Sequence, residues 1–458
     1  MTMVMPSFHA VRGRLPALAF FCCSLTAGLS FVGHSMAGVL NLPQAYALAL
    51  ERDATLRAAR AGATAANEQL PQAVGQWRPN VSLSASRFNN NLLREPTSNL
   101  TAPTPEQYAS YNQTLSLRQP VLRKPLLDNL TQARFRVEDA QAGLDREVQN
   151  LSVRLVGAYL ENLLSQDQLA LVQVQHKLIT SQLDAAQKSF AAGSGIRTDI
   201  DEAQARLDLN KAQTVEAKLQ VEMTLRQLEA IINQPVERLA PLNASHLLGL
   251  KLEDRSLSDW IALAEAQSPE IKSMQARLEV ARLEIAKAQG AHLPTLDAIA
   301  QVMRSGSENV LALNSNYTNR LIGLQLNLPL YSGGLVDSSV RQAVASFEQA
   351  QEQLEATRRD LGVRVHREYR GIIEGPLRIK AQEQALVSAD QWVISSQRSY
   401  QAGNRTVIDV LNAEQQRQVV LRDLMQARYL LFLSKVKLVS LAGLDVTPLL
   451  SEGSSPAE

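Results

Sequence analysis

The stretch SFAAGSGIRTDIDEAQ (residues 189–204) returns as SYQAGNRTVIDVLNAEQ (residues 399–415), roughly 200 residues later in the chain. In each stretch a serine is followed by an aromatic residue, then by a glycine and a Thr-x-x-Asp pattern. Gly193, Gly195 and Gly403 indicate tight reversals between helices, because glycine tolerates the backbone conformations that such turns need. The two stretches therefore predict two helical hairpins.

The similarity extends well beyond these reversals. LPQAYALALERDATL, from Leu42, aligns with LSDWIALAEAQSPEI, from Leu257, and GQWRPNVSL aligns with GAHLPTLDA at the same offset. Further along, RQPVLRKPLLDNLTQA pairs with NLPLYSGGLVDSSVRQA, which places Pro120 opposite Pro329. The chain therefore reads as two copies of one unit, residues 38–234 and 257–444, joined by a linker at 235–256 and followed by a tail at 445–458.

Composition limits the functional classes. The 458 residues contain only 5% aromatics, and the formal net charge is +1. A nucleic-acid-binding protein normally carries a basic excess, so no nucleic-acid partner is expected. The abundance of Ala, Leu and Gln instead favours long helices.

The N-terminus has the pattern of a secretory signal peptide, residues 1–37. Arg12 and Arg14 precede the apolar run LPALAFFCCSL, and small residues lead to Ala37. Both cysteines of the chain, Cys22 and Cys23, lie in this segment. We therefore expect an exported protein whose mature chain has no disulfide and no thiolate metal site.

Each copy predicts the same order of elements. A helix from Leu42 to Gln76, with Pro71 as a possible bend, is followed by two short alternating runs, VSLSAS (81–86) and QTLSL (113–117). The second copy offers LDAIAQV (296–302) and RLIGLQLNLPL (320–330) as its strands, and polar loops separate the two strands of each pair.

The helix after each strand pair is unusually long. Residues 126–192 contain no proline, and a continuous helix of this length would span about 100 Å. A first helix and a post-reversal helix, placed end to end, would match that length. In the second copy, Gly375-Pro376 predicts a kink or pause in the long helix.

Heptad seams can be traced along both arms of the first hairpin. Small and polar residues dilute them, which allows close approach of the helices without a dry core. The long arm gives the series Val153, Gly157, Leu160, Leu164, Asp167, Leu171, Val174, Leu178, Ser181 and Ala185. The returning arm gives Ile200, Ala203, Leu207, Asn210, Thr214, Ala217, Val221, Thr224, Leu228 and Ile231.

Four strands are too few to close a membrane barrel, for which about eight is the minimum. Identical copies could complete the wall by pooling their strands. A helical body of about 100 Å also exceeds the hydrocarbon core of about 30 Å, so it must project into an aqueous space.

The chain resembles the TolC family of outer-membrane efflux proteins over essentially all of its mature length. The residues that carry the resemblance are GQWRPNVSLSAS, GAHLPTLDA, NLPLYSGG with Gly333 and Gly334, and both reversals. The resemblance implies a mainly α fold with a transmembrane β-barrel contribution: four strands per chain complete a twelve-stranded barrel in a homotrimer. It also implies a long coiled-coil α-barrel that extends from the outer membrane of a Gram-negative bacterium into the periplasm.

The family works as the exit duct of tripartite export systems. The resemblance implies a periplasmic adaptor and an inner-membrane ABC or RND transporter as partners, besides outer-membrane lipid. GSGIRTDIDEAQARLDLNKAQ is closer to members that serve type I protein secretion. The alternatives are the outer-membrane component of a multidrug efflux pump and, from a different class, a periplasmic coiled-coil adaptor protein.

The resemblance also implies a gate at the periplasmic reversals. Tyr400 and Arg405 would take part in links that hold the entrance shut, and Asp409 would line the constriction. Asn412 stands where some members carry a second aspartate. The alternative for Asp409 is a helix cap with Thr406, and for Asp201 capping with Thr198 is the favoured reading.

No enzyme signature accompanies these patterns. The histidines beyond the signal segment, His176, His246, His292 and His366, stand alone, without metal-ligand spacing or a neighbouring nucleophile motif. We therefore expect a protein without catalytic residues, cofactor or metal.

Overall fold

The computed structural model describes residues 39–94, 104–242, 255–308 and 315–453. The predicted signal peptide (1–37) lies outside the described residues, as do much of the predicted linker and the end of the tail. The boundaries proposed for the two copies stay a prediction. Within the described part, the chain is dominated by helices and contains four strands, so the prediction of a mainly α chain with four strands is confirmed.

The first predicted helix is broken into three. Instead of one helix over Leu42–Gln76, the chain forms α1 (Leu42–Arg52), α2 (Ala54–Asn67) and α3 (Gln69–Gly75). The buried Asp53 makes the first break, because its carboxylate accepts a hydrogen bond from the Leu56 N–H (2.7 Å) and so caps a new helix. The second break, at Glu68, comes three residues before Pro71, whose nitrogen cannot donate a helical hydrogen bond.

The second copy repeats the first of these breaks. Ser268 separates α7 (Leu257–Gln267) from α8 (Pro269–Gln289), and a short 3-10 turn (Gly290–His292) follows. Ser268 has the same extended backbone as Asp53 and is equally buried. The two copies thus change direction at equivalent places.

The four strands form one antiparallel sheet in the order β1-β2-β3-β4. They are β1 (Asn80–Arg94), β2 (Thr104–Leu122), β3 (Thr295–Ser307) and β4 (Ser315–Asn327). All four lie where strands were predicted, but β1 and β2 run far into the predicted polar loop. Backbone pairing continues there through polar residues, as where Asn90 lies opposite Tyr108 and donates to Ser110 Oγ (2.8 Å).

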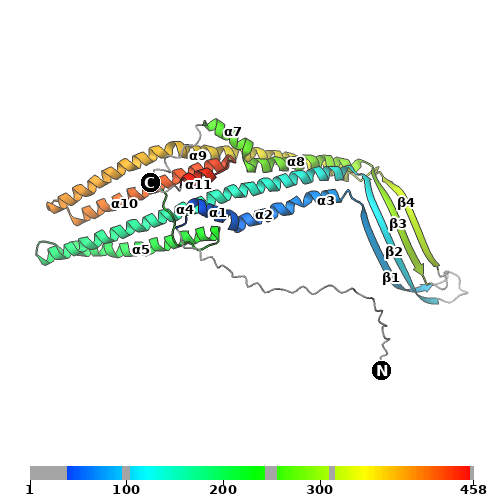
Figure 1. Ribbon diagram of the computed structural model, residues 1–458, viewed down its shortest axis with the longest axis horizontal. Helices are drawn as coiled ribbons and strands as arrows, with labels where there is room; N and C mark the ends of the chain where they lie inside the picture. The colour runs from blue at the N-terminus through cyan, green and yellow to red at the C-terminus, as the bar shows by residue number, and fades with distance from the viewer. Residues whose placement is uncertain (1–38, 95–103, 243–254, 309–314, 454–458) are drawn as a thin grey trace, which may run out of the picture. The chain divides into compact units, whose positions relative to one another are not determined.

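Two helices of nearly equal length follow the strand pairs. α4 (Lys124–Ala191) has 68 residues and α9 (Leu335–Gln401) has 67, or about 100 Å each. α5 (Arg197–Ile232) returns along one part of α4, and α1 to α3 lie beside the other part (Figure 1). In the second copy, α10 (Val407–Leu441), α7 and α8 lie along α9, and α11 (Thr447–Gly453) follows. The predicted end-to-end stacking of shorter helices beside a long one is confirmed.

The predicted seam is right for α5 and wrong for α4. Seven of the predicted α5 positions are buried: Ala203, Leu207, Asn210, Ala217, Thr224, Leu228 and Ile231. On α4 only Leu160 of the predicted series is buried, and the buried residues beyond it include Ser165, Val172, Ile179 and Ala186, each one position after a predicted residue. α4 packs against both α5 and α10, so its apolar residues occupy more than one face and do not define a single seam.

The largest apolar core lies near the middle of the long helices. Tyr159 of α4 is completely buried there, and its hydroxyl donates to the Leu40 and Ala240 carbonyls (3.1 and 2.7 Å). Phe432 and Val436 of α10 belong to the same core. The core therefore joins the two hairpins. The Tyr159 hydroxyl in addition holds the segments at Leu40 and Ala240, which flank the first copy.

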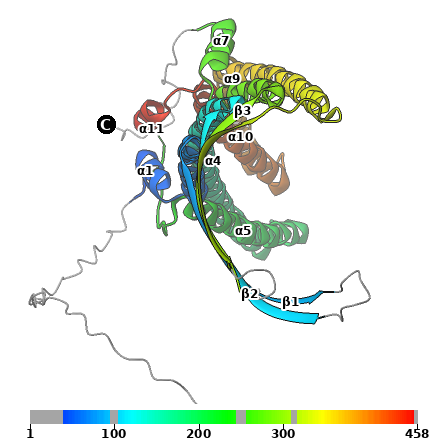
Figure 2. The ribbon, with the colours of Figure 1, turned by 90° about the vertical axis from the view of Figure 1, so that its right-hand side faces the viewer.

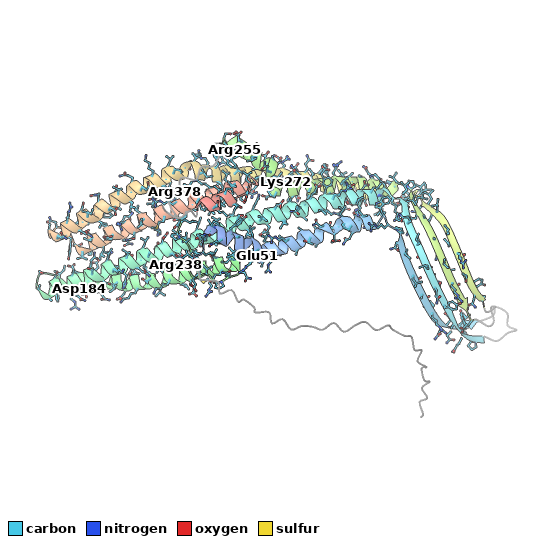
Figure 3. The ribbon with its side chains drawn as sticks, viewed as in Figure 1. Glu51, Asp184, Arg238, Arg255, Lys272 and Arg378 are labelled. Atoms are coloured by element: carbon cyan, nitrogen blue, oxygen red, sulfur yellow. The ribbon has the colours of Figure 1, made fainter. Side chains whose placement is uncertain are left out.

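The outer surfaces of the helices are strongly charged. Many ion pairs join side chains one turn apart, such as Lys188 with Asp184 (2.7 Å), which lies close to the first reversal (Figure 3). Such pairs are typical of water-exposed helix faces. Among the described helices, none combines the length and apolar content needed to cross a membrane.

The connections from the strands to the two long helices differ in structure. At Pro120 the β2 register shifts, and the buried Asp297 of β3 binds Arg118 and Arg123 (2.5 and 2.8 Å) just before α4. After β4 the chain passes Pro329 and then Gly333 and Gly334, whose φ angles are +61° and +79°. These positive φ angles let α9 begin at a sharp angle to the strand.

The predicted pause at Gly375-Pro376 is wrong, because α9 runs through both residues. Gly375 has a packing role instead. A Cβ at this position would lie 2.7 Å from Leu431 Cδ1 of α10, and Leu431 is 2% exposed. The glycine thus lets α9 and α10 approach closely around the cluster of Ile379, Leu424 and Leu431.

Replacing Gly375 should therefore separate the two helices. We expect Gly375→Val to destabilise the protein by about 1–3 kcal/mol through overpacking. The matched control in the same helix is Gly362→Ala, where no atom of the chain lies within 4 Å of the added Cβ. The control should gain up to about 1 kcal/mol from helix propensity. Denaturant unfolding of both variants measures the difference, and equal stability would contradict the packing role.

Candidate functional site

The two helix reversals have nearly the same backbone. Gly193 and Gly403 carry φ angles of +76° and +75°, a conformation that L-residues rarely adopt. In the first reversal the Ser194 and Gly195 N–H groups both donate to the Ser189 carbonyl (3.0 Å). A Cβ on Gly195 would lie 2.9 Å from the Phe190 nitrogen, so the turn also needs its second glycine.

The second reversal ends in a side-chain cap. The Thr406 N–H and its hydroxyl both donate to Asp409 Oδ2, at 3.0 and 3.1 Å, where α10 begins. The hydrogen bond from the Thr406 N–H is the main reason why the pKa of Asp409 lies below its usual range. The bond from the Thr406 hydroxyl and the nearby charge of Arg405 lower this pKa further. Asp409 therefore caps a helix, and its second carboxylate oxygen is not used in that cap.

The first reversal lacks this cap, and the predicted role of Asp201 as a cap is wrong. α5 begins at Arg197 with Ile196 at the cap position, so Thr198 already lies inside the helix. Asp201 pairs instead with Arg197 one turn away (3.5 Å), and both side chains are largely exposed. The residue that corresponds to Asp409 is Asp199, which lies three residues after the cap position, as Asp409 does.

An apolar cluster joins the two hairpins just behind the reversals. Ile179, Leu183, Ala203 and Leu207 come from the first hairpin, and Val407 and Leu411 come from α10. Leu411 is 5% exposed, which makes its burial worth about 1.5–3 kcal/mol. The contact between hairpins at this end is therefore mainly hydrophobic, a feature that no sequence pattern indicated.

The predicted gate residues take different places around this cluster. Tyr400 packs against it as a partly buried side chain. In the part of the chain that the structure describes, neither its hydroxyl nor the exposed Arg405 guanidinium makes a hydrogen bond or an ion pair. Within one chain, Tyr400 and Arg405 thus form no link, and any link they make must reach beyond it.

One polar bond crosses between the hairpins at this level. Arg206 Nη2 of α5 donates to Asn412 Oδ1 of α10 at 3.0 Å, and Arg206 also lies 3.5 Å from Glu202. Sequence reasoning considered Asn412 only as a missing aspartate and did not identify Arg206. The side-chain amide oxygen of Asn412 can accept this bond without carrying a charge.

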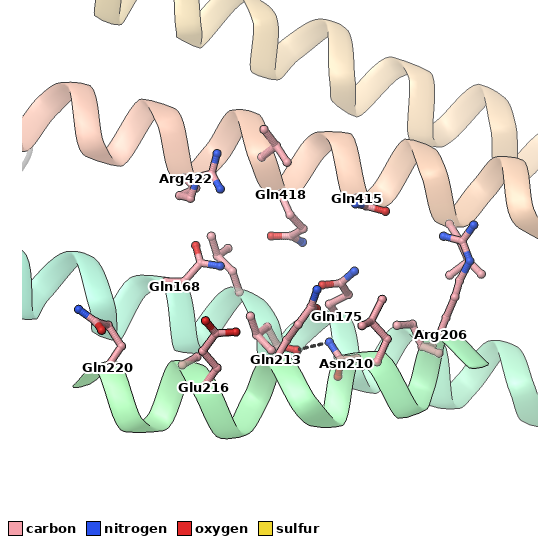
Figure 4. Close-up of a pocket in the computed structure, with 17 residues that line it drawn as sticks. Gln168, Gln175, Arg206, Asn210, Gln213, Glu216, Gln220, Gln415, Gln418 and Arg422 are labelled. Atoms are coloured by element: carbon pink, nitrogen blue, oxygen red, sulfur yellow. Dashed lines mark hydrogen bonds between the residues drawn. The ribbon is translucent and has the colours of Figure 1, made fainter. Parts of the chain in front are cut away.

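Between this cluster and the core in the middle of the long helices, the hairpins separate around a polar groove of about 570 Å³. Six glutamines line it, together with Arg206, Glu216 and Arg422: Gln168, Gln175, Gln213, Gln220, Gln415 and Gln418 (Figure 4). With 3.6 residues per turn, Gln168 lies roughly 180° around α4 from Tyr159. The groove therefore opens on the side of α4 that is opposite the Leu40 and Ala240 segments.

A half-buried acid lies in the same contact between α4 and α10, nearer the middle core. Asp167 of α4 accepts a hydrogen bond from the Tyr429 hydroxyl of α10 (2.8 Å). Burial raises the pKa of Asp167, and the bond from Tyr429 only partly opposes this. Since a raised carboxyl pKa favours the protonated form, its contribution to this contact is present at low pH and is lost as the pH rises through the raised pKa.

No cluster of at least three His, Cys, Asp or Glu side chains suited to a metal ion occurs among the residues with described positions. His176 Nδ1, for example, lies 2.9 Å from Asn210 Oδ1 on the neighbouring helix. This end of the molecule consists of turns, a helix cap, an apolar contact and a polar groove.

The sequence matches the family model described as "Outer membrane efflux protein" over residues 45–234 and 260–444. The chain is 31% identical to the "Proteases secretion protein PrtF" of Dickeya chrysanthemi over 418 residues, which cover 88% of each chain. It is 33% identical to the "Alkaline protease secretion protein AprF" of Pseudomonas aeruginosa over 400 residues, covering 85% of this chain and 82% of that one.

The fold is similar to a solved structure of CusC, described by its authors in terms of transmembrane channel formation. The TM-score is 0.76 with 15% sequence identity, and the match covers 88% of this chain and 92% of that chain. At this identity the likeness concerns the fold alone.

The hydrophobic contact between the hairpins can be separated from the polar one by mutation. Leu411→Ala should cost about 2–5 kcal/mol at a buried site and so speed amide hydrogen exchange around residues 404–411 more than tenfold. Arg206→Ala, which removes a partly exposed polar link worth about 0–1 kcal/mol, should change that exchange less than fivefold. Exchange in α8, far from the reversals, is the internal control. Equal effects of the two changes would show that the polar bond contributes as much as the apolar cluster, and would contradict a mainly hydrophobic contact.

Proposed function

The chain belongs to the family of outer membrane efflux proteins, and from this premise we propose that it acts as a homotrimeric exit duct for secreted proteins. Proteins of this family are outer-membrane channels that extend into the periplasm, and they are not enzymes. The proposal concerns three finer points: how many chains form the duct, what passes through it and how it closes.

The observation that carries the proposal is that one face of the sheet is apolar and the other is polar. The strand register places Val81 opposite Leu117 and Leu83 opposite Leu115, and Leu115 in turn opposite Val302. These residues, with Ile322 and Leu324 of β4, make up the apolar face of the sheet. Ile322, Leu83 and Leu324 are 91%, 74% and 71% exposed in a single chain, as expected for side chains that lipid would cover.

The opposite face of the sheet is polar. Ser82 lies opposite Ser116, with their hydroxyl oxygens 2.7 Å apart, and Ser84 lies opposite Thr114. Ser116 is in turn paired with Gln301 of β3. Apolar-out and polar-in alternation is the pattern of membrane barrels with a water-filled interior.

The sheet cannot close on itself, which supports association with identical chains. β1 and β4 each pair with only one strand, so each leaves a row of backbone N–H and C=O groups without partners in the sheet. Each unsatisfied group in lipid costs several kcal/mol. Pairing β1 of one chain with β4 of the next would satisfy both edges, and three copies would supply twelve strands.

The helices offer a matching pair of uncovered edges. On α5, Val215, Leu219 and Met223 follow each other at four-residue spacing and are 69%, 58% and 52% exposed. On α9, Ile373 and Leu377 are 51% and 68% exposed. These stripes are unusual for helices otherwise covered with charge, and we propose that α5 packs against α9 of the neighbouring chain.

Protein cargo is the better supported alternative for what passes through the duct. PrtF and AprF are both named as protease secretion proteins, and each relative matches most of this chain. We therefore propose a type I secretion system as the context, with a periplasmic adaptor and an inner-membrane ABC transporter as partners. Multidrug efflux with an RND transporter is the second candidate, because the matching family model is itself described as "Outer membrane efflux protein".

Closure would take place at the reversals. In a threefold assembly the three copies of Asp409 would face one axis, and three carboxylates in a narrow neck favour cations. Because the Tyr400 hydroxyl and the Arg405 guanidinium make no hydrogen bond or ion pair with the described residues of their own chain, they are available to bind the neighbouring chain and hold the neck shut. The groove lined by glutamines would then face the inside of the duct.

Deleting the gene in the source bacterium tests the proposed cargo. We expect secretion of at least one large protein to stop while drug susceptibility is unchanged, and the wild-type gene should restore secretion. Increased drug sensitivity with normal secretion would support the efflux pump instead. A soluble monomer in the periplasmic fraction would support the adaptor and exclude a duct.

Two substitutions separate the charge of Asp409 from its role as a cap. Asp409→Ala should lower cation preference in planar bilayers, whereas Thr406→Val, which removes the capping hydroxyl and keeps the carboxylate, should leave selectivity unchanged. Because the pKa of Asp409 is lowered, wild-type preference should persist as the pH falls to the ordinary carboxyl range of about 4. Unchanged selectivity in Asp409→Ala would mean that Asp409 is only a cap.

A further inference from the structure

Three arginines stand on the apolar face of the sheet, at the end remote from the helices. Following the strand register away from the helices, Arg320 lies opposite Val302, Arg304 lies opposite Gln113, and Arg87 lies opposite Tyr111. All three point to the same side as Leu83 and Leu115, because paired residues share a face. The apolar face therefore ends in a cationic border.

The structure gives these arginines no acidic partner. In the described part of the chain, none of the three takes part in an ion pair within 4.0 Å or in a side-chain hydrogen bond. A neighbouring chain would not supply a partner from its edge strands either, since β1 and β4 contain no Asp or Glu. Pairing between edge strands would therefore bring no carboxylate to these arginines.

Two of the arginines border a surface cavity of about 560 Å³. Arg87 and Arg304 lie on its sides with Tyr111 and Gln113 between them, and the small side chains of Ala85 and Ala109 leave room above the strands. Glu308 also lines this cavity, without an ion pair to either arginine. The set combines two guanidinium groups and an amide around an open space.

Tyr111 is fixed in place across the sheet. Its hydroxyl donates to Asn316 Oδ1 of β4 at 2.7 Å, so the side chain spans β3. This is possible because residue 306 is glycine: a Cβ there would lie 2.4 Å from the tyrosine ring. Tyr111 is therefore held against the sheet and does not collapse into the cavity.

The spacing suits a phosphorylated group. Arg87 and Arg304 are separated by two strand spacings and two residues along the strand, which places their Cα atoms roughly 12 Å apart. Two arginine side chains can bridge such a distance around phosphate oxygens, which the planar guanidinium binds through paired hydrogen bonds.

We propose that this arginine border binds phosphate groups of lipids in the outer leaflet of the membrane. The inference rests on the proposed function, because it needs the apolar face to lie in lipid and the helices to point into the periplasm. A lipid fits better than free phosphate, since its acyl chains would lie on Leu83, Leu115 and Ile322 while its phosphate meets the arginines. Charged side chains on a lipid-facing surface are tolerated near the headgroups, where their cost falls to about 0–1 kcal/mol.

Lipid retention by the full-length protein, purified in a neutral detergent, tests this proposal. Native mass spectrometry would compare lipid A, a diphosphorylated acyl disaccharide, with phosphatidylcholine as the zwitterionic probe. We expect wild-type protein to prefer lipid A and the double variant Arg87→Gln/Arg304→Gln to bind it roughly tenfold more weakly, with no change for phosphatidylcholine. Arg134→Gln, at an exposed arginine of α4, is the matched control and should behave as wild type.

The outcomes are distinguishable. Equal lipid A binding by the wild type and the double variant would overturn the proposal. Complete displacement of lipid A by excess inorganic phosphate would also overturn it, in favour of a site for free phosphate. If the protein inserts equally well into membranes with and without phosphorylated lipid, only this inference fails. If it inserts into no membrane and forms no trimer, the proposed function fails first.

Discussion

The unpaired edges of the four-stranded sheet are the constraint on which the rest of the structure depends. An edge strand exposes backbone groups that water can satisfy and lipid cannot. The apolar face is too exposed for a sheet that stays in water, yet β1 and β4 prevent a single chain from entering lipid alone. Assembly with identical chains would resolve both problems. It would also explain why the helices bear uncovered apolar stripes along their sides.

The two hairpins contact each other in three zones of different character. A dry core around Tyr159 and Phe432 joins them near the middle, and a smaller apolar cluster with Leu411 joins them behind the reversals. Between these zones lies a groove lined mainly by glutamines. The small cluster is the weaker of the two apolar contacts, since it contains far fewer buried side chains. Separation of the hairpins should therefore begin at the reversals, while the middle core remains closed.

Much of this architecture could be predicted from the sequence because the same unit occurs twice. Both reversals, the four strands and the α5 seam follow from glycine positions, alternation and heptad spacing. The α4 seam did not, because helices pack on two of its sides and local periodicity cannot choose between them. The break at Asp53 was missed for a related reason: it depends on one buried carboxylate that bonds to the Leu56 N–H, within an otherwise good helical pattern.

The error at the first reversal shows how sequence similarity and structural equivalence can diverge. Thr198-x-x-Asp201 matches Thr406-x-x-Asp409 in letters, but α5 begins two residues earlier than that match requires. Asp199 consequently takes the place that Asp409 holds in the second hairpin. Ile196 cannot replace the capping threonine, so the first hairpin starts its returning helix without a side-chain cap. The two hairpins, although nearly equal in length, thus differ at their tips. The carboxylate of Asp409 is fixed because it caps α10, whereas Asp199 takes part in no such cap. A gate built from both would have a rigid acidic element and a more adaptable one. The structural difference between the two hairpin tips therefore comes from a two-residue shift in where the returning helix begins, which the duplication conceals.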